Sequence, residues 1–202
     1  MLEGKKTITS IDVLCKRVKE ITAERTTLVI GLDGMAGVGK TTVGKELARR
    51  LNARLISLDD YVEKKRGTYV PHLRCDEIRE LLENSGSSIV IEGVCLRSVA
   101  ERCRVDIQLY IYVRRINKYG RWDDEDVCLV LEPVEELKER ERELREMAKR
   151  LSRGDEQVAP SEHYKPGLAE ELIDYHHDHA PVLKADIVFD VVENEALAEY
   201  AG

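Results

Sequence analysis

The sequence predicts an α/β fold in which a mostly parallel five-stranded sheet is covered by helices on both faces. Short apolar runs typical of strands alternate along the chain with stretches of helical periodicity. A glycine-rich segment that fits a phosphate-binding loop lies between the first apolar run and the helical stretch that follows it. The length of 202 residues suits one domain with a sizeable core. We therefore expect residues 1–202 to form a single domain.

The glycine-rich segment fits the pattern G-x-x-x-x-G-K-[ST], with the residues Gly34, Met35, Ala36, Gly37, Val38, Gly39, Lys40 and Thr41. Glycines let the backbone curl around phosphate groups with its N–H groups pointing inward, and the helix that follows adds partial positive charge. The pattern assigns Lys40 to the β- and γ-phosphates of a nucleoside triphosphate and the Thr41 hydroxyl to Mg²⁺. The segment thus predicts a three-layer P-loop NTPase fold that uses ATP and Mg²⁺.

Five segments are predicted as strands, at residues 27–33, 54–58, 88–91, 105–113 and 186–191. The fourth has the clearest pattern, because every second residue from Val105 to Val113 is apolar. Helical periodicity predicts helices over about 11–24, 40–52, 76–84, 133–153 and 168–179. Residues 61–74 contain Gly67 and Pro71, and we expect a loop or small hairpin there.

Acidic residues follow two of the predicted strands. Asp59 and Asp60 come after the second strand, and Glu92 closes the third. Ligands of such sheets bind beyond the carboxyl ends of the strands. A carboxylate there can take the proton from an attacking hydroxyl, or it can bind Mg²⁺ directly or through water. The alternative is that these residues only cap turns.

The sequence around these residues resembles the uridine kinase and phosphoribulokinase group of P-loop kinases, and nicotinamide riboside kinases share its general pattern. The resemblance is carried by IGLDGMAGVGKTTVGKELARRLN, LISLDDY, IVIEGV and ADIVFD. It implies that Asp59, or Asp60 as the near alternative, is the catalytic base. It also implies that Thr41, Glu92 and Asp59 serve the metal and that Thr42 contacts the α-phosphate.

The resemblance implies phosphoryl transfer from ATP to a hydroxyl of a small molecule, a nucleoside or related metabolite. The pyrimidine-nucleoside motif of that group is missing, since GTYVPHLRCD stands after the second strand instead. The acceptor therefore remains open. The arginine-rich lid motif is missing too, and we expect a lid within 114–153. Arg114, Arg115 or Arg121 would then supply charge to the transition state, whereas the arginines of 132–153 have many glutamates to pair with.

Two other functions of a P-loop protein compete with a kinase. A regulatory GTPase would need the guanine-reading pattern N-K-x-D, but the nearest match, Asn117 to Gly120, ends in glycine. A nucleoside triphosphate-binding regulatory or assembly protein would need no small-molecule acceptor, so phosphorylation of candidate acceptors separates it from a kinase.

The composition of the chain restricts the classes of partner that we expect it to bind. The net charge of −7 disfavours binding to a nucleic-acid backbone, and no apolar run is long enough to span a membrane. The five cysteines show no C-x-x-C spacing, so we expect reduced packing thiols and a cytoplasmic protein. The run from Tyr175 to His179 is expected at the surface end of a helix rather than in a metal site.

Overall fold

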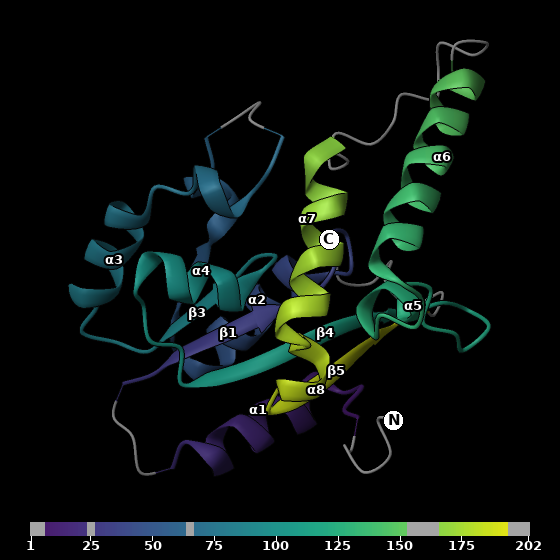
Figure 1. Cartoon of the computed structure of the whole chain (residues 1–202). Coiled ribbons are helices and arrows are strands. Elements are labelled where there is room, and N and C mark those ends of the chain that lie inside the picture. The colour runs from purple at the N-terminus through teal and green to yellow at the C-terminus, as the bar shows by residue number, and fades with distance from the viewer. Residues whose placement is uncertain (1–6, 24–26, 64–66, 153–165, 194–202) are drawn as a thin grey trace.

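A parallel sheet with strand order β2-β3-β1-β4-β5 forms the centre of the structure (Figure 1). The structure is a computed structural model that describes residues 7–23, 27–63, 67–152 and 166–193. The strand bounds are β1 Val29–Asp33, β2 Arg54–Ser57, β3 Ile89–Glu92, β4 Leu109–Ile116 and β5 Ile187–Val192. In the register of the sheet, Ile30 lies opposite both Val90 and Leu109. β1 is therefore the central strand, and its apolar run suits burial on both faces.

Helices cover both faces of this sheet, as the sequence predicts. One face carries α1 (Ile11–Ile21) and α2 (Lys40–Leu51), and the other carries α3 (Cys75–Glu83), α4 (Leu96–Cys103) and α7 (Pro166–His179). Buried side chains of α1 and α2, among them Leu14 and Leu47, share one core with Ile30 and Leu32 of β1. Helices α5 (Glu125–Cys128) and α8 (Pro181–Lys184) contribute Cys128 and Val182 to a smaller cluster. The long helix α6 (Val134–Ser152) packs beside α7.

The structure confirms the predicted fold class and differs most from the sequence prediction in the bounds of β4 and in three helices, α4, α5 and α8, which were not predicted. β4 begins at Leu109 rather than at residue 105, because its neighbour β1 pairs with it only from Ile30 onward. Ile107 continues the apolar pattern and is buried, although it lies outside the strand. Helix α4 was not predicted from the sequence. Its eight residues are too few for a clear helical period. Within the described ranges, no helix combines the length and the apolar character that a bilayer span requires.

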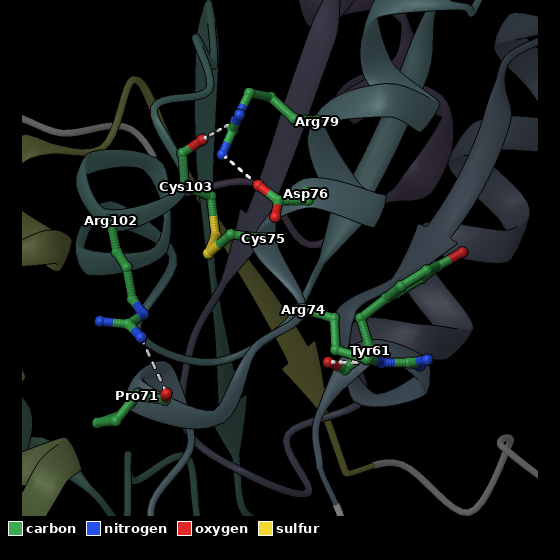
Figure 2. Close-up of a disulfide and its surroundings, with 8 residues drawn as sticks. All are labelled: Tyr61, Pro71, Arg74, Cys75, Asp76, Arg79, Arg102 and Cys103. Carbon is green, nitrogen blue, oxygen red and sulfur yellow. Dashed lines mark hydrogen bonds and ion pairs between the residues drawn. A yellow bond between two sulfur atoms is a disulfide. The ribbon is translucent and has the colours of Figure 1, made fainter.

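A disulfide joins Cys75, the first residue of α3, to Cys103, the last residue of α4 (Figure 2). This pair corrects the expectation that all five cysteines are free thiols. The two residues are 28 apart in sequence, and packing of α3 against α4 brings their Cα atoms to 4.8 Å. Two cysteines that meet only through helix packing have no characteristic spacing in the sequence, so the sequence could not predict this pair. Cys15, Cys95 and Cys128 are free and buried, as expected for packing residues.

His176 of α7 is buried, which corrects the expectation of a surface position for that part of the helix. Its Nδ1 lies 2.7 Å from the carbonyl oxygen of Leu172, which can only accept, so Nδ1 carries the proton. Nε2 then accepts from the Tyr112 hydroxyl at 2.7 Å. His177, the next residue, is exposed. Among the described residues, no cluster of three or more His, Cys, Asp or Glu side chains could hold a metal ion.

The burial of neutral His176 predicts a pH-dependent stability. Burial lowers the pKa of His176 from 6.5 to about 4, so between these values the unfolded chain binds a proton that the folded chain excludes. The stabilisation is complete above pH 6.5 and is lost as the pH falls toward 4. We expect the free energy of unfolding to fall by up to about 1.4 kcal/mol per pH unit in this window. Urea titrations at pH 7, 6 and 5 measure it.

The matched control for this prediction is the exposed neighbour His177. His176→Gln keeps a donor and an acceptor at the site and should remove most of the decline below pH 6.5. His177→Gln should leave the decline as in the wild type. An equal decline in all three proteins would contradict the assignment to His176.

Candidate functional site

The phosphate loop connects the end of β1 to the start of α2, as the sequence predicts. Its glycines Gly34, Gly37 and Gly39 have φ values of 146°, 79° and 98°, a backbone region that other residues rarely adopt. At Gly34 a Cβ atom would lie 2.4 Å from the carbonyl oxygen of Val113 in β4, so only glycine fits. Such a loop at a helix N-terminus suits an anion such as a phosphate group.

The side chains of the loop divide between the core and the site. Val38 is buried and packs into the core below the loop, whereas Met35 and Ala36 are partly buried against neighbouring clusters. Thr42, in the first turn of α2, is exposed. The structure therefore leaves the assignment of Thr42 to an α-phosphate as a prediction.

Lys40 is buried, and its ammonium group lies against the loop itself. Nζ donates to the carbonyl oxygens of Gly34 at 3.1 Å and Met35 at 2.6 Å. Burial lowers the pKa of Lys40, and the nearby carboxylates of Asp33, Glu92 and Asp59 oppose this effect. The ammonium therefore lies within the loop and close to the acidic residues of the strand ends, and its contact with the β- and γ-phosphates stays a prediction.

Asp33, the last residue of β1, is a site residue that the sequence reasoning missed. Its buried carboxylate accepts hydrogen bonds from the backbone N–H of Gly34 at 2.8 Å and from the hydroxyl of Tyr175 in α7. The N–H of Leu96 at the start of α4 donates at 3.5 Å. Burial raises the pKa of Asp33, and these donors and Lys40 oppose that rise. Asp33 thus connects the beginning of the phosphate loop to α4 and α7.

The candidate magnesium site lies between α2 and the ends of β2 and β3. The Thr41 hydroxyl donates to Glu92 Oε1 at 3.0 Å, and the Ser57 hydroxyl donates to the same oxygen at 2.6 Å. Glu92 is 2% exposed. These are the hard oxygen groups that Mg²⁺ prefers, and a Mg²⁺ ion bound to a nucleotide needs few protein ligands because phosphates and water supply the rest. Ser57 was not predicted from the sequence, since a lone serine at a strand end gives no signal.

Asp59 and Asp60 lie in the short 3-10 turn η1 (Leu58–Tyr61) that follows β2, and both are exposed. The two residues differ in their neighbours. The carboxylate of Asp59 is close enough to Lys40 to raise the pKa of the Lys40 ammonium. Asp60 instead offers its backbone carbonyl to Arg74 Nη2 at 2.5 Å. Asp59 is therefore the aspartate with an electrostatic effect on Lys40, and the choice of Asp59 or Asp60 as the base stays a prediction.

Residues 61–63 and 67–74 form a hairpin, here called the 61–74 hairpin, beside these aspartates. Val62 and Leu73 form an antiparallel bridge, and Arg74 donates to the carbonyl of Asp60. Arg74 also donates to the carbonyl of Tyr61, as Figure 2 shows. The disulfide begins at the next residue, Cys75.

Of the three arginines predicted to supply charge, Arg114 and Arg115 belong to β4 and lie in different surroundings. The Arg114 guanidinium donates to both carboxylate oxygens of Asp190 at 2.7 and 2.8 Å, and both side chains are 11% exposed. Arg115 pairs with Glu193 at 2.7 Å and donates to the carbonyl oxygen of Gly37 at 3.3 Å. Arg115 is therefore next to the phosphate loop, and the contacts of Arg114 favour a structural role.

Arg121 and the arginines of α6 lie farther along the chain. Arg121 is exposed in a turn in which Asn117 accepts its backbone N–H at 3.0 Å. Arg140 and Arg142 pair with Glu132 and Glu170, as expected for a charged surface helix. A lid within 114–153 stays a prediction, and it excludes residues 114–116 because they belong to β4. The segment also brings Asp124 within electrostatic reach of Lys40, which the sequence did not predict.

The fold and several segments of this chain are similar to known kinases. A sequence model of the shikimate kinase family matches residues 36–80. A segment of 44 residues is 43% identical to the shikimate kinase of Thermus thermophilus, and 56 residues are 41% identical to the pentafunctional AROM polypeptide of Schizosaccharomyces japonicus. These segments cover 22% and 28% of this chain, and only 24% and 4% of the two relatives.

Two solved structures share the fold over most of the chain. A possible uridine kinase from Bacillus stearothermophilus is 18% identical with a TM-score of 0.52, covering 89% of this chain and 97% of that one. A protein assigned as a fructose transport system kinase from a Silicibacter species is 16% identical with a TM-score of 0.51, covering 89% and 98%. The chain therefore shares its three-layer α/β fold with these two proteins.

The contacts of Glu92 predict a change in metal dependence. Glu92→Gln should raise the Mg²⁺ concentration needed for half-maximal binding of a fluorescent ATP analogue, because a neutral amide binds a hard cation or its water less well than a carboxylate. Glu80→Gln, an exposed change on α3, is the control and should match the wild type. An unchanged Mg²⁺ dependence in Glu92→Gln would assign Glu92 to structure alone.

The two neighbouring arginines of β4 should respond differently to truncation. Arg114→Ala leaves the nearly buried Asp190 without its partner, so we expect the free energy of unfolding to fall by roughly 3 kcal/mol. Arg115→Ala removes an exposed pair and should cost less than about 1 kcal/mol, but it should weaken binding of the ATP analogue. Urea unfolding and fluorescence titration measure the two effects separately. A large loss of stability in Arg115→Ala, together with weaker nucleotide binding in Arg114→Ala alone, would contradict these roles.

Proposed function

We propose that this protein is a small-molecule kinase that transfers the γ-phosphoryl group of ATP to a hydroxyl. The observation that supports this most is the grouping of Lys40, the Thr41–Glu92 pair and Asp59 around one phosphate loop. A protein that only binds the nucleotide needs the first two groups but no base. A protein that hydrolyses the nucleotide would use such a carboxylate to orient water, so the acceptor panel below separates it from a kinase. In this proposal the chain is a single kinase domain.

Each group has a role in the proposed transfer. The N–H groups of the phosphate loop and Lys40 bind the β- and γ-phosphates, and Mg²⁺ would neutralise charge on them from the side of Thr41 and Glu92. Asp59 accepts the proton of the acceptor hydroxyl as its oxygen bonds to the γ-phosphorus and ADP departs. Arg115, next to Gly37, supplies further positive charge.

The acceptor is proposed only as a class, a hydroxylated metabolite. The match to shikimate kinases covers residues 36–80, which include Asp59 and part of the 61–74 hairpin. The structural neighbours carry the names of a uridine kinase and a fructose transport system kinase. These names give a test panel of shikimate, uridine and fructose, extended to other nucleosides, sugars and cyclic alcohols.

A regulatory GTPase finds no support in the turn that resembles its guanine motif. The Asn117 side chain accepts the N–H groups of Tyr119 and Arg121 at 2.9 and 3.0 Å, and its amide donates to Asp123 at 2.6 Å. With these bonds made inside the turn, the amide is engaged in building the turn rather than in reading a base.

The experiment that tests the proposal is ATP consumption with each panel compound, with the phosphorylated product identified by mass. Lys40→Ala is the negative control and should abolish transfer, because Lys40 is the cation of the phosphate loop. ATP consumption that is independent of every compound would favour the alternative, a regulatory or assembly protein that hydrolyses the nucleotide without an acceptor.

The proposed base predicts an order between two neighbouring residues. Asp59→Asn should lower the transfer rate by about 10²- to 10⁴-fold, the usual contribution of a general base, whereas Asp60→Asn should lower it far less. The carboxamide is isosteric, so folding is preserved in both. A dead Asp60→Asn with an active Asp59→Asn would place the base one residue later, and activity in both would place it elsewhere.

A further inference from the structure

The hydroxyl of Tyr69 is enclosed in the protein. Tyr69 is 6% exposed, and its Oη makes no hydrogen bond of full geometry among the described residues, although the Asp59 carboxylate lies near enough to act on it as an acceptor. Burying a hydroxyl without a partner costs free energy, and native proteins rarely keep one without a functional reason. Tyr69 belongs to the 61–74 hairpin, whose function the phosphate-loop pattern does not explain.

The hydroxyl fills a space that exists because residue 93 is glycine. A Cβ atom on Gly93 would lie 2.8 Å from Tyr69 Oη and 2.9 Å from Leu58 Cδ1. Gly93 directly follows Glu92, and Leu58 directly precedes Asp59. The Tyr69 hydroxyl thus lies between the metal-site strand end and the turn that carries the proposed base.

The charged groups around Tyr69 are carboxylates. Burial, together with the negative charges of Asp59 and Glu92, raises the pKa of Tyr69 well above its usual value. The phenol therefore keeps its proton, and it can act as a donor toward an acceptor such as a carboxylate. Glu92 already accepts from Thr41 and Ser57, whereas Asp59 is exposed and faces the site.

The backbone around Tyr69 is fixed by contacts with other elements. The Glu171 carboxylate of α7 accepts the N–H groups of Tyr69 at 2.5 Å and Val70 at 2.9 Å. On the other side of the hairpin, Arg102 Nη2 donates to the carbonyl of Pro71 at 3.0 Å (Figure 2). Because the backbone is bound on both sides, the position of the hydroxyl beside Asp59 is set by the fold.

We propose that Tyr69 is the positioning residue of the phosphoryl transfer, and that its O–H donates to one oxygen of the Asp59 carboxylate. The other oxygen of Asp59 is then directed at the acceptor hydroxyl and takes its proton. The acceptor oxygen bonds to the γ-phosphorus as the bond to ADP breaks, and Tyr69 keeps its own proton throughout. The inference rests on the proposed function for the catalytic role of Asp59.

The first test is Tyr69→Phe, which removes only the hydroxyl. We expect kcat to fall about tenfold, the size of one lost hydrogen bond in the transition state, with the KM for ATP unchanged. Tyr61→Phe, in the same hairpin, is the matched control and should keep the wild-type kcat. A wild-type kcat in Tyr69→Phe would overturn the inference, as would a change confined to the KM for ATP.

The second test asks whether Tyr69 acts through Asp59. In an Asp59→Asn background, Tyr69→Phe should lower kcat no further, because the carboxylate that the hydroxyl positions is already absent. A rate in the double variant equal to the product of the two separate losses would mean independent action and would overturn the inference.

A third test does not depend on activity. If no panel compound is phosphorylated by the wild type, the proposed kinase function fails, but the contact can still be measured. Urea midpoints of Tyr69→Phe, Asp59→Asn and the double variant form a cycle, and the double variant should shift by less than the sum of the two single shifts. An additive shift would overturn the Tyr69–Asp59 contact whether or not an acceptor is found.

Discussion

The buried carboxylate of Asp33 is the contact on which the geometry of the site depends. A carboxylate is costly to bury unless donors surround it, and here they come from three elements: the phosphate loop at Gly34, the start of α4 at Leu96 and the Tyr175 hydroxyl of α7. The Lys40 ammonium adds positive charge nearby. Moving any of these elements would remove one of the donors that offset the burial of this carboxylate. The loop is therefore fixed at its first residue by the rest of the fold, before any phosphate binds.

Helix α7 connects this contact to the 61–74 hairpin. Glu171 and Tyr175 lie one helical turn apart on the same face, so a rigid helix sets the spacing between their partners. Glu171 binds the backbone of Tyr69 and Val70, and Tyr175 binds Asp33. The nucleotide side and the 61–74 hairpin are thus positioned by the same helix. A change in α7 would be expected to affect both sides of the site together.

Local patterns of the sequence predicted the parts of the site that local chemistry determines. The glycines, Lys40 and Thr41 follow from the chemistry of phosphate binding, and Asp59 and Glu92 follow from the ends of parallel strands. The sequence could not predict contacts that join distant segments. Tyr175 reaches Asp33 across 142 residues, and Cys75 meets Cys103 only because α3 packs on α4. The late start of β4 also depends on a distant segment. The strand begins where β1 pairs with it, not where the apolar alternation of its sequence begins.

Arg114 and Arg115 are adjacent in β4, yet their side chains lie in different surroundings. Successive side chains of a strand point to opposite faces, so two adjacent arginines in β4 cannot both reach the phosphate loop. Arg114 lies opposite Asp190 in the register with β5 and pairs with it. The Cζ atom of Arg114 also lies over the Trp122 ring, 4.9 Å from the ring centroid. Arg115 emerges beside Gly37. The sequence identified both arginines as candidates, and the register of β4 with β5 determines which one lies near the phosphate loop.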